Sequence, residues 1–454
     1  MSASLALRPA LSLGQHVGRT IRLALPVMLA RSGLLVMISV DIFMVGRFGG
    51  DELAFYAIAS APQIGVFLLG TGLVTGVLVL TAQRAGAGQQ ATCGRIWQAG
   101  AIQAAVFGGF GAVVLLNGEA LLGLLGQSPA LIEGGAPVLA QFAPGLPALL
   151  LFVATSYFLE GLGRPAPGMI VMILANVANL GLNALFMLGP FDLGAEGAAL
   201  GTTIARWFMA LALVGYVLFM PDAPRFGVRI WRTGATWQAW RDLARLGVPI
   251  AASFGMEHGA FLAVVTFAGW LGPTDLAAYQ VCLNMVSLIY MLAIGLGTAT
   301  GVRVGHAVGL TDPIGMRQAG WVGAGLGVVV MLVITPMILL GRNEVAAVYT
   351  SDPAVRAIVQ DALLLVGMIL VCDALQGIMI AVLRAIADIW VPVSIQLACF
   401  WLAAVPVSYT LGIRMEMGVA GLLAGLWIGL ALASLFLIAR FRHVGDVRFA
   451  AAPA

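Results

Sequence analysis

The sequence predicts an all-α polytopic membrane protein with twelve transmembrane helices, arranged as two six-helix bundles related by a pseudo-twofold axis along the membrane normal. Of its 454 residues, 61% are hydrophobic and only 9% are charged, and the mean hydropathy is +1.01. Ordinary soluble domains carry roughly 25% charged residues, so this composition cannot supply a water-soluble surface. Long apolar runs and an internal repeat give the number of helices and their grouping.

Apolar runs long enough to cross a bilayer follow one another with short breaks at charged residues, glycine and proline. A membrane-spanning helix needs about 20 mostly apolar residues. The first run contains Arg31 and Asp41 and is too long for a cleaved signal peptide. The predicted spans lie near residues 21–45, 53–82, 95–117, 132–162, 166–189, 195–220, 245–271, 275–302, 318–341, 355–386, 390–413 and 417–440.

The longest polar connector lies between the sixth and seventh predicted spans and divides the chain. It separates an N-lobe at residues 1–220 from a C-lobe at residues 245–454, which leaves residues 221–244 as a cytoplasmic linker. The tryptophans and arginines of PDAPRFGVRIWRTGATWQAWRDLARLG, which begins at residue 221, predict an amphipathic segment that lies on the membrane surface.

The arginines predict how the chain is oriented in the membrane. All 23 basic residues are arginine. With the N-terminus inside, seventeen of them fall in inner loops and tails, among them Arg8, Arg303 and Arg384. The outer loops hold Arg47, Arg342, Arg356 and Arg414. This bias follows the positive-inside rule. We therefore expect a multi-pass protein of the inner (cytoplasmic) membrane with both termini in the cytoplasm.

An internal repeat relates the two halves of the chain. FGGDELAFYAIA at residue 48 matches LGPTDLAAYQVC at residue 271, and two further matches place PVMLARSG against PIAASFGM and GAEGAALG against GVAGLLAG. With a fourth match, GTGLVTG at residue 70 against GLGTATG at residue 295, the patches keep one order at offsets of 223 to 225 residues. Because each half holds six spans, both halves insert the same way up, around an axis along the membrane normal. Two parallel bundles around a cleft are typical of transporters; the alternative is a repeat kept only for packing.

Among the acids inside predicted spans, Asp41 lies in the first span, Glu257 in the seventh and Asp373 in the tenth. An ionised acid at a helix centre costs about 2.5–3.5 kcal/mol to insert. Three of them would cost roughly 8–10 kcal/mol, comparable to the net stability of a whole protein, about 5–15 kcal/mol. Such acids usually mark ion or proton pathways. A structural salt bridge to Arg31 or Arg206 is the alternative for Asp41.

Asparagines accompany the acid of the N-lobe. Asn176, Asn179 and Asn183 stand at i, i+3 and i+7 in the fifth predicted span, so they share one face of the helix. Hydrogen bonding between helices explains such a stripe equally well. Beside an intramembrane aspartate such as Asp41, it also supplies neutral oxygens that could coordinate a cation or hold a carboxyl proton.

The C-lobe has its own set of polar residues. Gln376 lies close to Asp373, and Asn284 lies in the eighth predicted span. Together with Glu257 they form the candidate C-lobe site for a cation or proton. His258 adjoins Glu257 but points about 100° away on a helix, so we interpret it as a packing or cavity residue.

Several segments spread over residues 20–440 carry a family resemblance. They are PVMLARSGLLVMISVDIFMVGRFGGDELA, LEGLGRPAPGM with NLGLN, ARLGVPIAASFGMEHG, AAYQVCLNMVSLIYML with GVRVGHAVG, and CDALQGIMIAVLRAIAD. Together they resemble the multidrug and toxic compound extrusion (MATE) transporters, in the NorM-like bacterial branch. The resemblance implies cation-coupled export of bulky organic cations by rocking between outward and inward states.

The resemblance also implies roles for particular residues. Asp41, Asn179 and Asn183 would form an N-lobe cation or proton site, and Glu257 and Asp373 would form the C-lobe site. NorM-like proteins that use sodium often carry a tyrosine one helical turn before the last of these acids. This chain has Ile369 at that position, which removes one oxygen from a C-lobe sodium site and leaves both acids in place.

The expected function is therefore secondary active antiport: export of cationic amphipathic drugs or toxic organic cations in exchange for H⁺ or Na⁺. We expect a monomer in the lipid bilayer, with no organic cofactor, no metal besides Na⁺ and no nucleic acid. The alternative is a flippase of a lipid-linked or other amphipathic metabolite in the same superfamily, whose cavity we would expect to be lined with arginines. An enzyme would need a nucleophile–base pair or a metal cluster, and the four histidines are scattered: His16, His258, His306 and His443.

Overall fold

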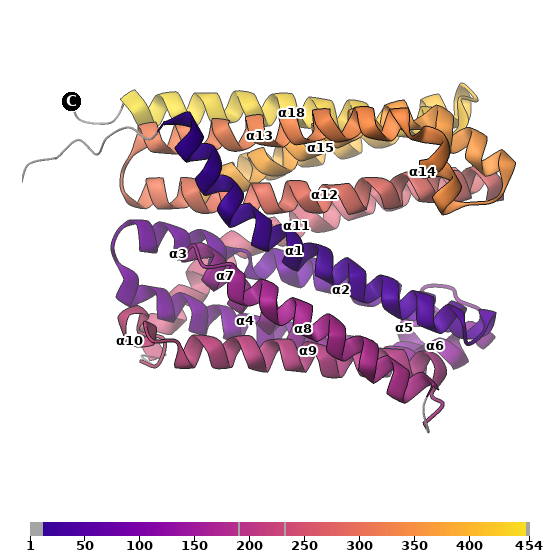
Figure 1. Cartoon of the computed structure of the whole chain (residues 1–454), viewed down its shortest axis with the longest axis horizontal. Helices are drawn as coiled ribbons and strands as arrows, with labels where there is room; N and C mark the ends of the chain where they lie inside the picture. The colour runs from indigo at the N-terminus through magenta and orange to yellow at the C-terminus, as the bar shows by residue number, and fades with distance from the viewer. Residues whose placement is uncertain (1–11, 189–190, 231–232, 451–454) are drawn as a thin grey trace, which may run out of the picture.

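The computed structural model describes residues 12–188, 191–230 and 233–450, and every regular element in those ranges is helical. Figure 1 shows the helices gathered in two bundles that lie side by side. The first bundle, the N-lobe, runs from α1 to α9, and the second, the C-lobe, runs from α11 to α18. The predicted fold class is confirmed.

The N-lobe elements in chain order are α1 (Leu13–Gly46), α2 (Gly50–Val74), α3 (Gly76–Gly86), the 3₁₀ turn η1 (Gln90–Thr92), α4 (Cys93–Leu116), α5 (Gly118–Leu124), α6 (Pro129–Phe142), α7 (Gly145–Gly161), α8 (Ala166–Asn183), the π-helical segment η2 (Ala184–Leu188) and α9 (Gly194–Phe219). The short α10 (Ala223–Phe226) connects the lobes. The C-lobe elements are α11 (Thr233–Leu271), α12 (Pro273–Gly309), α13 (Pro313–Leu340), α14 (Arg342–Tyr349), α15 (Pro353–Ala385), α16 (Trp390–Leu397), the π-helical η3 (Ala398–Ala404), α17 (Val405–Tyr409), the π-helical η4 (Thr410–Arg414) and α18 (Gly418–Ala450).

Twelve membrane spans fit this helix pattern. In the described ranges, eleven helical stretches are long and apolar enough to cross a membrane, and the pair α6 and α7, bent by 42°, makes the twelfth.

Several helices extend beyond the predicted ends. α1 begins at Leu13 and not near residue 21 because Ser12 caps it: the Ser12 Oγ accepts from the Gln15 N–H (3.3 Å), and the Gln15 Oε1 accepts from the Ser12 N–H (3.0 Å). A capping box fixes the first turn of a helix whatever its hydropathy.

The second half of the predicted linker is also helical. α11 begins at Thr233 and continues without a break through the seventh span to Leu271. The residues predicted to lie as a separate surface segment therefore extend a membrane helix. Of the arginines that predicted the orientation, Arg8 and Arg232 lie outside the described residues.

The repeat seen in the sequence reappears in the contacts between the lobes. Gly72 of α2 packs on Ala251 of α11, so closely that a Cβ on Gly72 would lie 2.5 Å from the Ala251 Cα. Gly295 of α12 packs on Met28 of α1 in the same way, with 3.0 Å from a Cβ to the Met28 N. Each residue of one pair stands 223 positions from its counterpart in the other, since 72 + 223 = 295 and 28 + 223 = 251. A pseudo-twofold axis therefore relates the lobes.

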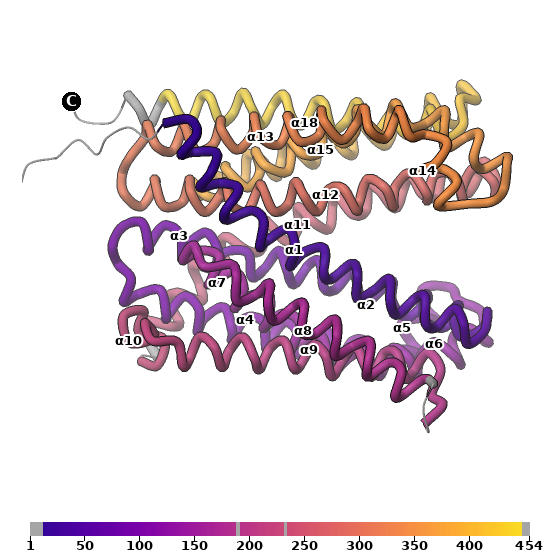
Figure 2. The backbone as a smooth tube through the Cα atoms, in the orientation of Figure 1, coloured from indigo at the N-terminus to yellow at the C-terminus, as the bar shows by residue number. Residues whose placement is uncertain are grey.

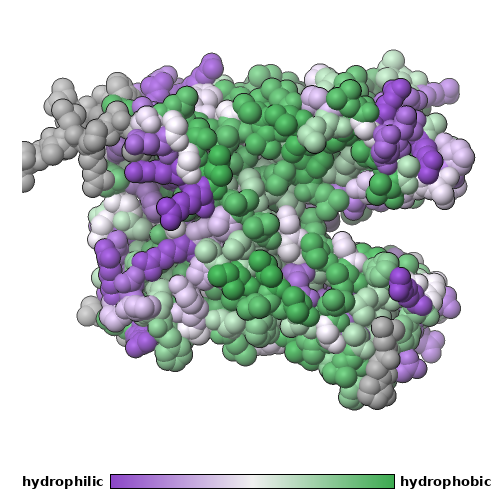
Figure 3. All heavy atoms as spheres, viewed as in Figure 1, coloured by the Kyte–Doolittle hydropathy of each residue, from purple (hydrophilic) through white to green (hydrophobic). Residues whose placement is uncertain are grey.

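The lobes meet at one end of the molecule and part at the other. Figure 2 shows α1 beginning and α18 ending at the same end, which we call the closed end. Figure 3 shows a cleft between the lobes at the opposite, open end, and a broad hydrophobic surface across the middle of the molecule with hydrophilic residues gathered toward both ends. That distribution is the one expected of helices that cross a bilayer.

Candidate functional site

Asp41 lies at the centre of a buried hydrogen-bond cluster in the N-lobe. It is 1% exposed, on α1. Its Oδ2 accepts hydrogen bonds from the Tyr56 hydroxyl of α2 (2.9 Å) and the Thr202 Oγ1 of α9 (2.6 Å). Its Oδ1 accepts from the Asn183 Nδ2 of α8 (2.6 Å). Three donors from three other helices thus compensate a carboxylate that has lost its water.

The cluster has acceptor capacity left over. The Asn179 Nδ2 donates to the Thr202 Oγ1 (3.0 Å), which places Asn179 one contact away from Asp41. The side-chain oxygens of Asn179 and Asn183 are both buried and have no hydrogen-bond partner within the described residues. Buried acceptors are rarely left unpaired in proteins. A carboxylate and two free amide oxygens could therefore serve a cation or a protonated group.

Asn176 does not belong to this cluster, so that part of the predicted site is wrong. Its Nδ2 donates to the Met172 carbonyl of the preceding turn (2.9 Å), and the side chain faces α1 near Gly33. The spacing i, i+7 puts residues on one face but also about 10 Å apart along the helix axis. Asp41 therefore contacts Asn183 directly and Asn179 through Thr202, while Asn176 lies outside the cluster.

The salt-bridge alternative for Asp41 fails. Arg31 instead pairs with Glu160 of α7 (3.3 Å, both side chains largely buried). The Gln63 amide oxygen accepts a hydrogen bond from the Arg206 Nη2 (2.9 Å). Arg206 acts on Asp41 only electrostatically, without a salt bridge. The contacts of Asp41 are therefore with uncharged donors.

Glu257 ends a chain of polar side chains in the C-lobe. Its Oε2 accepts from the Gln396 Nε2 of α16 (3.3 Å). The Gln396 Oε1 accepts from the Ser253 hydroxyl, and the Ser253 Oγ in turn accepts from the Arg384 Nη2 of α15 (3.3 Å). Glu257 is half-buried and Gln396 and Ser253 are buried. Hydrogen bonds thus connect Glu257 through Gln396 and Ser253 to the guanidinium of Arg384.

Asp373 and Gln376 lie beside Glu257. Asp373 is 4% exposed on α15, and its carboxylate interacts electrostatically with that of Glu257 and with Tyr290 of α12. Gln376 is fully buried near Glu257, yet its amide oxygen and nitrogen make no hydrogen bond of good geometry to the described residues. Two carboxylates and an unpaired amide form a second place where a cation or proton could be held.

Asn284 is not part of the C-lobe site, which corrects the prediction. It is exposed on α12, and its Oδ1 accepts from the Tyr349 hydroxyl of α14 (3.3 Å). Tyr290, which does face the acids, follows Asn284 by six residues, about 9 Å of helix rise. Asn284 therefore lies nearer the open end than Glu257 and Asp373 do.

Replacing Glu257 with glutamine and Asp373 with asparagine should give non-additive losses. Each single change is expected to slow coupled export. The double change should cost less than the sum of the two, with an interaction term of about 0.5–3 kcal/mol, because one ion would engage both carboxylates. Initial export rates of the four proteins measure this term. Asn284→Ala serves as the control that leaves the rate unchanged, and losses that add within about 0.5 kcal/mol would show that the two acids act independently.

Sequence reasoning missed several members of both clusters. They are Tyr56, Thr202, Ser253, Arg384 and Gln396. Arg384 was assigned to an inner loop but occupies the last turn of α15. Tyr56 gave a signal, since it recurs in the repeat as Tyr279. Thr202, Ser253 and Gln396 gave no such signal in the sequence, because hydroxyl and amide side chains are common in membrane helices.

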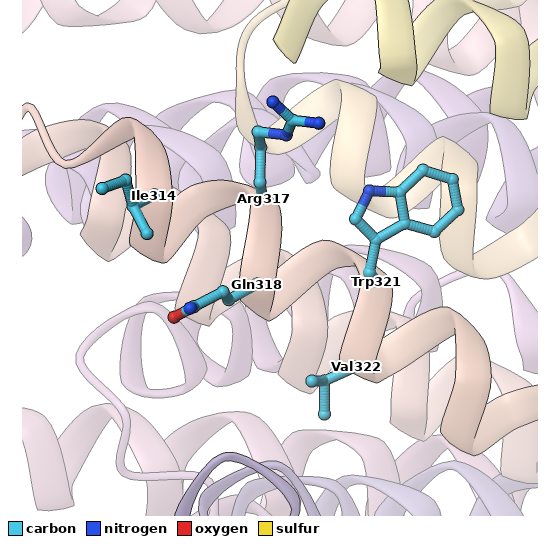
Figure 4. A pocket seen from close by; sticks show the side chains of 5 residues that line it. All are labelled: Ile314, Arg317, Gln318, Trp321 and Val322. Atoms are coloured by element: carbon cyan, nitrogen blue, oxygen red, sulfur yellow. The ribbon is translucent and has the colours of Figure 1, made fainter. Parts of the chain in front are cut away.

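Two hollows lie outside both clusters. A groove of about 420 Å³ runs between the lobes, lined by Ser32, Leu35, Val36, Ser39, Val40 and Phe43 of α1 and Leu288 of α12. A second pocket of about 400 Å³ lies along α13, between Ile314, Arg317, Gln318, Trp321 and Val322 (Figure 4). The groove is lined by helices of both lobes, whereas the pocket is lined by one helix of the C-lobe. Neither hollow is lined by a candidate site residue.

Known proteins resemble this chain over nearly its whole length. The MatE family model matches residues 26–185 and 249–410. A probable multidrug resistance protein NorM of Caulobacter vibrioides is 37% identical over 93% of this chain and 90% of that protein. The multidrug resistance protein NorM of Photobacterium profundum is 30% identical over 93% of this chain and 94% of its own length.

Solved structures share the fold. The eukaryotic MATE transporter AtDTX14 superposes with a TM-score of 0.88 at 20% identity, covering 95% of this chain and 96% of that one. An outward-facing multidrug resistance MATE family transporter of the MOP superfamily has a TM-score of 0.88 at 19% identity, with the same coverage.

Two helical lobes around a cleft, with buried acids in each lobe, define a multi-pass membrane transporter, not an enzyme. The chain belongs to the MatE family, whose members are transporters. The family resemblance inferred from the sequence segments is thereby confirmed.

Proposed function

We propose that this protein is a multidrug exporter of the inner membrane that expels cationic, amphipathic organic molecules from the cytoplasm in exchange for protons. The names of its multidrug resistance relatives support drugs as the cargo. The observation that carries the proposal is the Asp41 cluster, in which a fully buried carboxylate is bound by neutral donors beside two unpaired oxygens.

Proton binding at Asp41 would change how the N-lobe helices hold together. In the present arrangement Asp41 accepts from Tyr56, Thr202 and Asn183. A protonated carboxyl becomes a donor at one oxygen, so at least one of those three donors must turn or withdraw. Because the donors sit on α2, α9 and α8, protonation would shift α1 relative to its neighbours. This links ion occupancy to helix position.

With both termini in the cytoplasm, as the arginines predict, the cleft would lie on the outer side of the membrane. If the arginine bias holds, the closed end, where α1 begins and α18 ends, faces the cytoplasm, and the structure is open to the outside. Cargo would be taken up after the lobes rock to open the other end. The groove between α1 and α12 would offer apolar contact, and Glu257 and Asp373 would offer counter-charge.

The coupling ion would be the proton, with sodium as the competing candidate. Ile369 is buried one turn before Asp373 and supplies no oxygen to the C-lobe site. The free oxygens of Asn179 and Asn183 would suit sodium in the N-lobe equally well. A flippase is less well supported, because Arg31, Arg206 and Arg384 are each engaged by neighbouring side chains. One chain would be the complete transport unit.

Cargo preference is expected to follow charge. A surface of apolar and aromatic groups near acids binds cations broadly, without fixed hydrogen-bond geometry. The purified protein should bind a dye cation more tightly than an anionic dye of matched size and aromatic area, by roughly tenfold or more, which corresponds to about 1.4 kcal/mol. Equilibrium fluorescence titration in detergent measures both affinities. Equal affinities, or a preference for the anion, would refute the cationic cargo class.

A further inference from the structure

Two equivalent hydrogen bonds cross from lobe to lobe at the closed end. The Gln83 Nε2 of α3 donates to the carbonyl of Ala385, the last residue of α15 (2.8 Å). The His306 Nε2 of α12 lies 2.8 Å from the carbonyl of Gly161, the last residue of α7. The repeat relates the two contacts, since 83 + 223 = 306 and 161 + 224 = 385. Each lobe thus gives one donor and one acceptor.

Both acceptors are carbonyls at helix ends. The last carbonyls of an α-helix have no amide four residues further on to accept from, and they carry the negative end of the helix dipole. Gly161 and Ala385 hold such positions in α7 and α15. Since a carbonyl can only accept, the His306 Nε2 carries hydrogen, which is true of one neutral tautomer and of the imidazolium. A side chain of the opposite lobe therefore caps each helix.

Glycines bring the donors into place. Gly86 and Gly309 are repeat mates, and a Cβ on them would lie 2.3 Å from the His306 carbonyl oxygen and 2.1 Å from the Gln83 carbonyl oxygen, respectively. Ala82 and Gly305, also repeat mates, touch one another. Residues related by a twofold axis meet only on that axis. The ends of α3 and α12 therefore cross on the pseudo-twofold axis, with one donor on each side of it.

We propose that Gln83 and His306 form a paired latch that holds the closed end shut while the cleft is open, and that both bonds break together when the lobes rock. Each donor and its acceptor belong to different lobes, so any rigid-body motion that opens this end must part them. The freed amide, imidazole and carbonyls would then meet water, which keeps the net cost of each bond small. A small cost in each bond suits a contact that is remade in every cycle.

The latch rests on the alternating opening assumed in the proposed function, but its test needs neither cargo nor coupling ion. Spin labels at Ala91 and His443, exposed positions near the closed ends of the two lobes, would be attached in a protein whose four native cysteines are replaced. Pulsed electron spin resonance in lipid nanodiscs then gives the distance distribution. Gln83→Ala or His306→Ala should raise the ratio of open to closed populations roughly fivefold, and the double variant roughly 30-fold.

Matched variants separate a latch from a general loss of packing. Because the two bonds are equivalent, His306→Gln and Gln83→His should keep the closed-end distance of the native protein. Ser434→Ala removes a hydroxyl that donates to the Cys372 carbonyl within the C-lobe (2.8 Å) and should not change the distance. An unchanged distribution in the folded double variant, or an equal shift from Ser434→Ala, would overturn the latch. Should the double variant not fold, the single variants and their exchanged forms decide the question. Absence of drug transport would count against the proposed function and leave this result intact.

Discussion

Replacing Asp41 with asparagine is expected to reduce drug export to the level of protein-free vesicles while the protein still folds and inserts. Asparagine has nearly the same shape, and the Tyr56 and Thr202 hydroxyls can turn to accept from its amide, since a hydroxyl both donates and accepts. The change removes the one group of the cluster that can carry a proton or balance a cation. Dye efflux from proteoliposomes measures export, and gel filtration with thermal unfolding measures folding.

Asn176→Ala is the matched control for this experiment. Asn176 lies on the same helix as Asn183 but hydrogen-bonds only to its own preceding turn. It should keep export near the native rate. Export at the native rate by Asp41→Asn would eliminate the N-lobe site. Loss of export in both variants would show that the asparagine face of α8 matters for packing and not for ion binding.

A pH gradient alone is expected to drive export in sodium-free buffer. Asp41, Glu257 and Asp373 can each carry a proton, whereas sodium needs several oxygens at once and finds Ile369 near the C-lobe acids. Exchanging one entering proton for one departing monovalent cation moves no net charge, so the pH difference supplies the whole driving force. A second proton per cycle would add about 2.3 kcal/mol for each 100 mV of membrane potential.

The measurement is dye efflux from proteoliposomes under an imposed pH gradient, with potassium as the only alkali cation. Clamping the membrane potential with valinomycin then distinguishes one proton per cycle from two, because only the second makes the rate depend on potential. The same vesicles with a sodium gradient and no pH gradient provide the comparison. No efflux under the pH gradient and full efflux under the sodium gradient would assign the Asp41 cluster to sodium.

Much of the fold could be predicted because the signals for it are local and strong. Apolar runs predicted the twelve spans. The repeat, with its 223-residue offset, predicted two lobes of the same orientation, and the equivalent contacts Gly72–Ala251 and Met28–Gly295 show that relation in the structure. Helix ends could not be predicted from hydropathy. Capping by Ser12 and the continuation of α11 from Thr233 depend on hydrogen bonds that hydropathy does not report.

The candidate sites could be predicted where an ionisable side chain interrupts an apolar run. An acid in an apolar run is a rare event, so Asp41, Glu257 and Asp373 were identified directly. Helical spacing added Asn179 and Asn183 but also Asn176, because it reports the face of a helix and not the depth. Tyr56 and Thr202 bond to Asp41 from 15 and 161 residues away, respectively, and nothing in a single sequence connects them.

The backbone contacts at the closed end bear on whether water and ions can pass between the lobes. At Gly86 and Gly309, one helix backbone lies directly against the backbone of the opposite lobe, and no methyl group would fit between them. Apposed backbones leave no gap for a file of water molecules along which protons could hop. A larger residue at either position would hold the lobes apart, and ions would then run down their gradient with no cargo exported. Glycine at these two places would therefore help to seal the closed end against water and ions.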